Sequence, residues 1–331
     1  MKNKKNIIIG LAIIIVILVI FLVYRNVSRK EKIEGKDFKI VTSFYPVYIM
    51  TENITKGAKN IEVVNMADTA VGCIHDYTLT TTDLKKIENA DVFIQNGLGL
   101  ENFTDKVLDT YPGIKVIESA KEIEDMLEAA EPYEETLEHN HEHEDVEQVE
   151  GTEEDDVEHH HHEDGVNVHS WISIDRYIVQ IKEIAQSLSE VNPENKQVYM
   201  DNLERYIVQL NSLKEKYKQA EEKIKGKYII SLNEAFEYFN ENIDINIITV
   251  ETNHERDTFS AEMLKSIIEE SKQKNIGVIV VDKDDSLKNA EAIAGETGAK
   301  VCTLDSGLTG KNDLMSYIKS MENNLKVLEN I

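Results

Sequence analysis

The chain has 331 residues, with 62 acidic side chains against 36 basic ones and a formal net charge of −26. This length is enough for two domains and a membrane anchor. So acidic a protein argues against a nucleic acid partner, because phosphate binding needs basic patches, and is compatible with a cationic ligand.

The first segment, residues 7–24, is an unbroken run of 18 residues, nearly all Ile, Leu, Val, Phe or Ala. As a helix it would be about 27 Å long, close to the thickness of one hydrocarbon core. A cleaved secretory signal would have a shorter apolar region followed by small residues. We therefore expect a single-pass signal anchor at residues 1–24 in the cell membrane, a linker at 25–37, and an extracytoplasmic domain beyond it.

Short strands and helices alternate through residues 38–190. Strands separated by helices predict a parallel sheet with helices on its faces. The first lobe is therefore expected to be an α/β domain. Its predicted strands are 38–42, 61–64, 91–94 and 115–117, and its predicted helices are 48–55, 81–88, 107–111 and 173–189.

Residues 131–164 interrupt this lobe with 16 Asp or Glu, seven His and no Lys or Arg. Such a segment cannot bury enough apolar surface to offset the entropy of ordering it, so it is predicted to be a solvated loop. One interpretation is a spacer; the other is a collector of divalent cations, because imidazole binds zinc, copper and nickel. The histidines concerned are His139, His141, His143, His159, His160, His161 and His162.

Residues 191–225 contain no Gly and, after Pro193, no Pro, and their apolar side chains recur at helical spacing. One helix of about 30 residues would be about 45 Å long and could pack along two domains. Residues 226–331 then repeat the alternation of strands and helices, with a first predicted helix at 234–240. The predicted fold class is α/β, with two parallel-sheet lobes joined by one long rigid helix. Ligands of such sheets bind at the carboxyl ends of the strands, which places a site in the cleft between the lobes.

Four residues at predicted strand ends or loop exits carry nitrogen or oxygen donors: His75, His169, Asn233 and Asp305. Each also has an ordinary structural explanation. His75 would be a surface residue, His169 a packing partner of Trp171, Asn233 a helix cap, and Asp305 a turn residue. Individually these signals are weak, and together they suggest a metal site at the mouths of two sheets.

Several motifs in order then give the chain a specific resemblance over residues 38–331. It resembles the substrate-binding proteins of zinc and manganese ABC transporters, the high-affinity zinc uptake and manganese adhesin-lipoprotein family. The acidic His-rich loop lies where the zinc branch of that family carries one. The matching segments are Val41–Pro46, Cys73–Tyr77 with Thr82–Leu84, Asn96–Glu101, His169–Trp171, Asn192–Asn195 with Tyr199 and Asn202, Glu234–Tyr238, and Glu296–Ala299 with Leu304–Asp305.

The resemblance implies that His75 and His169 are metal ligands from the first lobe and that Asp305 is the carboxylate ligand of the second. It implies a monomer that captures Zn²⁺, with Mn²⁺ as the alternative, and delivers it to an ABC permease in the same membrane. The family's third metal ligand is His in zinc binders and Glu in manganese binders, whereas this chain has Asn233 at that position. An amide oxygen is a poor replacement for imidazole on zinc.

Three consequences of Asn233 stay open. Asn233 binds weakly, Glu234 or a water takes its place, or the cleft has lost high affinity and the His-rich loop holds the metal. A surface adhesin of the same fold with a weakened site is therefore the competing function. A zinc hydrolase fits less well, because the sequence has no His-Glu-x-x-His motif. Cys73 and Cys302 form one disulfide or are two buried apolar side chains.

Overall fold

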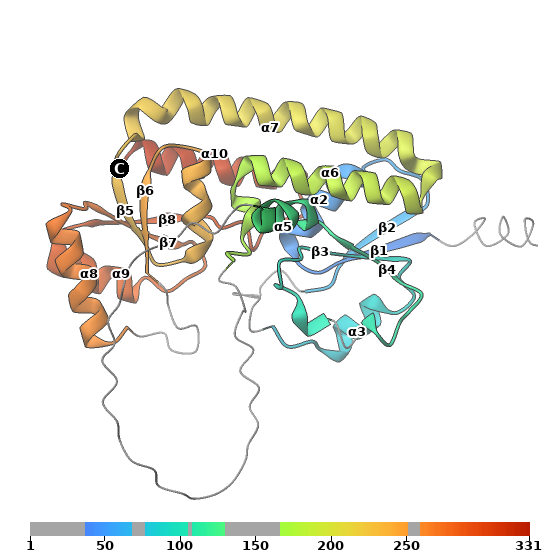
Figure 1. Ribbon diagram of the computed structural model, residues 1–331, viewed down its shortest axis with the longest axis horizontal. Coiled ribbons are helices and arrows are strands. Elements are labelled where there is room, and N and C mark those ends of the chain that lie inside the picture. The colour runs from blue at the N-terminus through green and yellow to red at the C-terminus, as the bar shows by residue number, and fades with distance from the viewer. Residues whose placement is uncertain (1–36, 68–76, 105–107, 130–165, 251–258) are drawn as a thin grey trace, which may run out of the picture.

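The computed structural model describes residues 37–67, 77–104, 108–129, 166–250 and 259–331. These ranges form two lobes, each built on a four-stranded parallel sheet (Figure 1). The predicted architecture of two α/β lobes is therefore confirmed. None of the helices in those ranges is long and apolar enough to cross a membrane, and the predicted anchor at residues 7–24 lies outside them.

The first sheet has the strand order β2-β1-β3-β4 and the second has the order β6-β5-β7-β8, so the lobes repeat one topology. In both, every strand pairing is parallel. Their strands are β1 (Phe38–Thr42), β2 (Ile61–Asn65), β3 (Val92–Gln95), β4 (Lys115–Glu118), β5 (Tyr228–Ser231), β6 (Asn246–Thr249), β7 (Val278–Asp282) and β8 (Lys300–Leu304).

Helices cover both sheets and largely follow the sequence pattern. One of them, α5, has no counterpart among the predicted elements, and the predicted helix at 234–240 proves to be 3-10 rather than α-helical. The helices are α2 (Tyr45–Thr55), α3 (Thr81–Ile87), α5 (Lys121–Ala129), α6 (Ile174–Val191), α7 (Lys196–Ile224), α8 (Ala261–Gln273), α9 (Lys288–Thr297) and α10 (Ser316–Glu329), with 3-10 turns η2 (Asn102–Thr104), η3 (Ser170–Ile172), η4 (Pro193–Asn195) and η5 (Glu234–Glu241).

The long helix α7 has 29 residues, which corresponds to about 43 Å. It packs on α2 and α6 of the first lobe and on α10 of the second, and in Figure 1 it runs over both lobes. Its buried stripe includes Tyr199, Leu203, Leu210 and Tyr217, which recur at helical spacing. The sequence prediction of one helix joining the lobes is thus confirmed.

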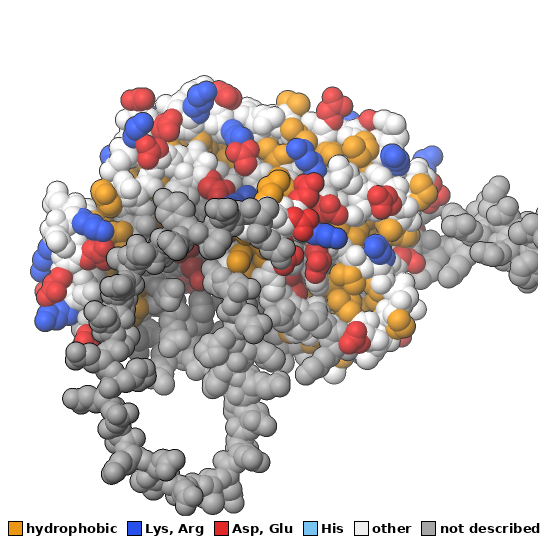
Figure 2. Space-filling view, viewed as in Figure 1, with side chains coloured by type: hydrophobic (Ala, Val, Ile, Leu, Met, Phe, Trp, Pro, Cys, Tyr) orange, Lys and Arg blue, Asp and Glu red, His pale blue; other side chains and the backbone are white. Residues whose placement is uncertain are grey.

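One continuous hydrophobic cluster extends from the first lobe through α7 into the second. The outer surface is polar instead, and Figure 2 shows acidic and basic side chains interspersed along its upper edge. Exposed pairs such as Lys216–Glu322 and Lys223–Glu329 connect α7 to α10 there. Because the shared core is continuous, the two lobes are packed against each other.

Candidate functional site

His169 lies directly before η3, and only 3% of its surface is exposed. The side-chain oxygen of Asn167 lies 2.9 Å from the ring Nδ1 and accepts a 3.0 Å hydrogen bond from the His169 backbone N–H. An imidazole that donates from Nδ1 carries its lone pair on Nε2, the arrangement that metal-binding histidines use. The local geometry therefore suits His169 as a metal ligand.

The orientation of the Asn167 amide is itself fixed by neighbours from the second lobe. Its Nδ2 donates to the Glu234 backbone oxygen and to a Glu237 carboxylate oxygen, both at 2.8 Å. The backbone carbonyl oxygen of Asn167 accepts a 2.7 Å hydrogen bond from the Tyr238 hydroxyl. The amide oxygen must consequently face His169, so this histidine is held by groups from both lobes.

A buried polar network supports the same segment from inside the first lobe. Asn96 donates to the Val168 carbonyl at 3.1 Å, next to His169 in the chain, and its backbone N–H donates to Glu101 at 2.6 Å. Glu101 also accepts bonds from Ser43 at 2.7 Å and from the Gly97 backbone at 3.0 Å. Burial raises the pKa of the Glu101 carboxyl to about 7, although these three donors act to lower it.

Trp171 connects this segment to the second lobe. Its indole Nε1 donates to the Ser306 carbonyl at 2.8 Å, and its own carbonyl accepts a 2.9 Å bond from the Tyr317 hydroxyl. The ring also packs edge-on against His169, with centroids 5.1 Å apart. Since Ser306 follows Asp305 in the chain, these contacts bring the segment that carries His169 next to the segment that carries Asp305.

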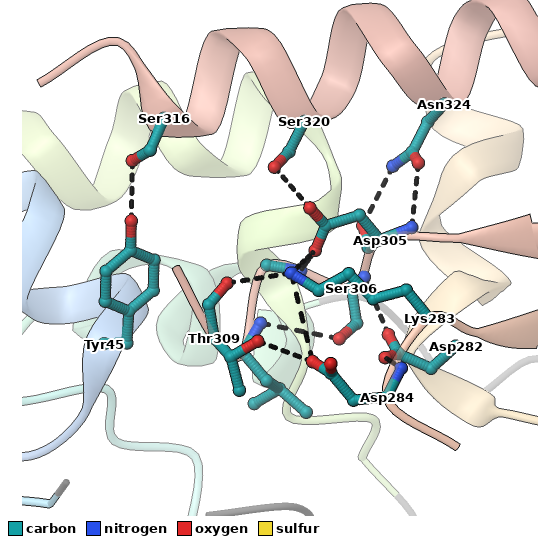
Figure 3. Close-up of polar contacts among 12 residues, drawn as sticks. Tyr45, Asp282, Lys283, Asp284, Asp305, Ser306, Thr309, Ser316, Ser320 and Asn324 are labelled. Carbon is teal, nitrogen blue, oxygen red and sulfur yellow. Dashed lines mark hydrogen bonds and ion pairs between the residues drawn. The ribbon is translucent and has the colours of Figure 1, made fainter. Parts of the chain in front are cut away.

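Asp305 follows β8 at the carboxyl end of the second sheet (Figure 3). Its Oδ1 accepts a 2.9 Å bond from the backbone of Gly307, which adopts a left-handed conformation with φ of 73°, and lies 2.9 Å from the Lys283 ammonium. Its Oδ2 accepts from the Ser320 hydroxyl of α10. Asp305 is thus at the predicted place, with both carboxylate oxygens engaged.

Asp282 and Lys283 were not among the predicted site residues. Asp282 is 2% exposed, and its carboxylate accepts 2.8 Å bonds from the backbone N–H groups of Asp284 and Ser306. It therefore holds together the loops that follow β7 and β8. The signal was present in the sequence as Asp-Lys-Asp-Asp directly after an apolar strand, a place where a ligand site is expected.

Asn233 caps η5, as the structural explanation of this residue expected. Its Oδ1 accepts a 3.0 Å bond from the Ala235 backbone, and its Nδ2 donates to Asp285 at 3.0 Å. The next residue, Glu234, places a carboxylate oxygen 3.8 Å from His169 Nδ1. The structure thus brings Glu234 close to His169, whereas the Asn233 amide has partners at both of its polar atoms, Ala235 and Asp285.

His75, the seven loop histidines and Cys73 lie outside the described residues. Within the described part, no three His, Cys, Asp or Glu side chains are grouped closely enough to hold a metal ion. The chain just after His75 is well anchored, because Asp83 accepts 2.8 Å bonds from the Tyr77 hydroxyl and the Thr80 backbone. Cys302 is a free cysteine buried in β8, which agrees with the alternative of a buried apolar side chain and not with a disulfide.

The family model described as "Zinc-uptake complex component A periplasmic" matches residues 40–331. The zinc-binding lipoprotein AdcA of Streptococcus pneumoniae is 29% identical over 91% of this chain and 57% of that protein. The high-affinity zinc uptake system protein ZnuA of Bacillus subtilis is 27% identical over 92% of this chain and 91% of that protein. The chain therefore spans little more than half the length of its streptococcal AdcA relatives.

Solved structures share the fold. Zn(II)-bound AdcA from Streptococcus pneumoniae superposes with a TM-score of 0.67 at 24% identity, covering 89% of this chain and 57% of that one. The laminin-binding protein Lmb of Streptococcus agalactiae, described as having adhesin and metal-transporting activity, gives 0.68 at 23% identity, covering 88% and 98%. FpvC of Pseudomonas aeruginosa in complex with Mn²⁺ gives 0.69 at 22% identity, covering 89% and 98%.

Proposed function

Because this chain belongs to the zinc-uptake complex component A family, we propose that it captures Zn²⁺ between its lobes and delivers it to an ABC permease in the same membrane. One observation carries the proposal above the others. His169 is buried, and Asn167 accepts from its Nδ1, so that the lone pair of the ring lies on Nε2. An imidazole oriented in this way is typical of a ligand supported by a second shell of hydrogen bonds.

The proposed ligands are His75 and His169 from the first lobe and Asp305 from the second. Zinc binds such nitrogen and carboxylate donors in tetrahedral geometry, and three protein ligands plus one further position are sufficient. Asn233, Glu234 or a water fills the fourth position. Two imidazoles favour Zn²⁺, while Mn²⁺, the ion bound by the structurally similar FpvC, is the alternative.

We assign the His-rich loop at residues 131–164 the role of a low-affinity collector that raises the metal concentration near the cleft. Its imidazoles must be neutral to coordinate, so the loop should release metal below about pH 6. The anchor at residues 1–24 would keep the protein, as a monomer, beside its permease. None of these features requires catalytic turnover.

A second candidate function, a surface adhesin with a weakened metal site, is favoured by one observation. Asn233 uses both polar atoms of its amide for the η5 cap and for Asp285, so it is poorly placed to replace the imidazole of zinc binders. The two functions differ in whether the cleft binds metal tightly when the loop histidines are removed.

The test is a competition titration of Zn²⁺ and Mn²⁺ against a chelator of known affinity. It uses the full-length chain in detergent with all seven loop histidines replaced by Gln. Transport predicts one tight zinc equivalent that H169A or D305N weakens at least a hundredfold. Lys223→Met, which removes an exposed ion pair between α7 and α10, is the control and should leave the affinity unchanged. Weak binding in the Gln variant, with tight binding only in the natural chain, would support the adhesin instead.

A further inference from the structure

The ammonium group of Lys283 lies against Asp305, the carboxylate that the family resemblance implies as a metal ligand. Lys283 Nζ lies 2.9 Å from Asp305 Oδ1, 3.1 Å from the Thr309 carbonyl oxygen and 3.9 Å from an Asp284 carboxylate oxygen (Figure 3). Three oxygen atoms from two loops thus surround one cationic nitrogen. The arrangement resembles a small cation site filled by the protein's own side chain.

The backbone fixes this position. β7 and β8 are paired up to Asp282 and Leu304, and the Lys283 N–H continues the ladder with a 2.7 Å bond to the Leu304 carbonyl. Lys283 and Asp305 therefore leave adjacent parallel strands side by side. The buried carboxylate of Asp282 then bonds to the backbone of both following loops, so neither residue is carried by an independent loop.

The ion pair is only partly open to water. The Lys283 side chain is 33% exposed and that of Asp305 is 18% exposed. Asp305 Oδ1 also accepts from Gly307, and Oδ2 from Ser320. A zinc ion binds a carboxylate oxygen at about 2.0–2.2 Å, which would place two cations within a few ångströms of each other. Because like charges at that distance repel in a partly buried site, a metal ion bound at Asp305 Oδ1 would compete with the ammonium for that oxygen.

We propose that Lys283 is a built-in competitor for Asp305: metal binding is an exchange in which the divalent ion displaces the ammonium, and release of the metal is assisted by its return. This inference rests on the proposed function, since it concerns the same metal site. Asp284, 3.9 Å from the ammonium, provides the carboxylate to which Lys283 moves. The competition lowers the affinity for every divalent ion by a similar factor, so a weakly bound ion is excluded first.

The experiment compares Lys283→Met, which keeps the chain length without the charge, with Lys283→Arg, which keeps the charge. Both are made in the full-length chain whose loop histidines are Gln, and zinc affinity is measured by chelator competition. We expect K283M to bind at least tenfold more tightly and K283R to stay within about threefold of the parent. Lys274→Met is the matched control, because Lys274 pairs with Glu270 at 2.9 Å in the same lobe, on α8.

A second readout separates competition from a structural role. In chelator, K283M should melt at the same temperature as the parent or slightly lower, while the rise in melting temperature on adding Zn²⁺ should be larger. If Lys283 had only a structural role, its replacement by Met would lower both the melting temperature in chelator and the rise in melting temperature on adding Zn²⁺. Unchanged or weaker zinc binding by K283M, at a cleft that D305N still weakens, overturns the inference alone. Absence of any cleft site that H169A and D305N affect would overturn the proposed function together with it.

Discussion

The two walls of the candidate site are stabilised in different ways. On one wall His169 is almost fully buried, and Asn167 and Trp171 fix its ring. On the other, Asp305 and Asn233 are directed at groups of their own lobe, namely Lys283 and the η5 backbone. The imidazole of the first wall is therefore preorganised, whereas the polar groups of the second wall would have to give up existing partners to bind a metal ion.

This difference bears on transport. A preorganised imidazole binds without further ordering cost, which favours capture. A carboxylate with an internal cation beside it gives up the metal more readily, which favours release to a permease. A transport protein needs both properties in one site.

The largest expected effect concerns the support beneath His169. Burial raises the pKa of Glu101 to about 7, above the 4.5 of an ordinary Glu, so the folded state retains a proton that the unfolded state has lost between these values. The contribution of the Glu101 side chain to the free energy of unfolding is fully present below pH 4.5 and is lost as the pH rises through 7. The loss is about 3 kcal/mol, from 1.36 kcal/mol for each pKa unit.

Urea unfolding of the parent and of Glu101→Gln at pH 5 and pH 8, with a chelator present, measures this effect. The glutamine cannot ionise, so the difference in unfolding free energy between the two proteins should shrink from pH 5 to pH 8. The glutamine variant should be less stable at pH 5, since its amide cannot accept the Gly97 N–H. A pH-independent difference would show that Glu101 is ionised throughout.

The next effect concerns the orientation of His169. Asn167→Ala removes the acceptor for Nδ1 and should weaken zinc binding by 10- to 100-fold, the usual range for loss of such a partner. Chelator competition with the loop histidines replaced by Gln measures it. Asn167→Asp keeps an acceptor for Nδ1 but places a carboxylate oxygen against the Glu234 carbonyl and the Glu237 carboxylate, so it should recover only part of the affinity.

Tyr238→Phe is the control for this prediction. It removes a hydrogen bond to the Asn167 carbonyl without touching the acceptor for His169. If Y238F and N167A weakened zinc binding equally, the effect would come from loosening the contact between the lobes, and Asn167 would have no specific role toward the imidazole.

Much of the fold could be predicted from the sequence, because strands and helices alternate with clear periodicity. The exceptions have local physical reasons. The predicted helix at 48–55 begins three residues earlier, at Tyr45, because Pro46 is tolerated in the first turn, where its missing N–H is not needed. The 3-10 geometry of η5 could not be read from an apolar pattern that suits an α-helix equally well.

The site could be predicted only in part. The strand-end positions of Asp305 and Asn233 follow from the topology. Their partners do not, because Lys283 and Asp305 are adjacent only through the pairing of β7 with β8, and Asn167 meets Glu237 only across the lobes. Contacts between residues so distant in sequence depend on strand register and lobe packing, which the pattern of one sequence leaves undetermined.

A smaller effect is expected from restoring an imidazole to the second wall. Asn233→His introduces the ligand that the family resemblance assigns to zinc binders and should raise zinc affinity about tenfold, or 1.4 kcal/mol. It also removes the η5 cap, which should cost about 1 kcal/mol of stability in urea unfolding. Asn233→Asp keeps the capping oxygen but replaces the donor to Asp285 with a second carboxylate, so it should also lose some stability. Tighter binding in N233D but not in N233H would mean that this position prefers a carboxylate.

The smallest effect is expected far from either wall, where α7 meets α10. Lys223 and Glu329 form a 2.8 Å pair there, but the Lys223 side chain is 64% exposed, so Lys223→Met should change the unfolding free energy by no more than about 0.5 kcal/mol. Tyr217 is fully buried and donates to the Met321 carbonyl at 2.8 Å, so Tyr217→Phe should cost about 1 kcal/mol. Both should leave zinc affinity unchanged. If K223M weakened zinc binding, the surface pairs between α7 and α10 would be setting the distance between the walls, and the buried contacts of Trp171 and Asn167 would not be sufficient to define the site.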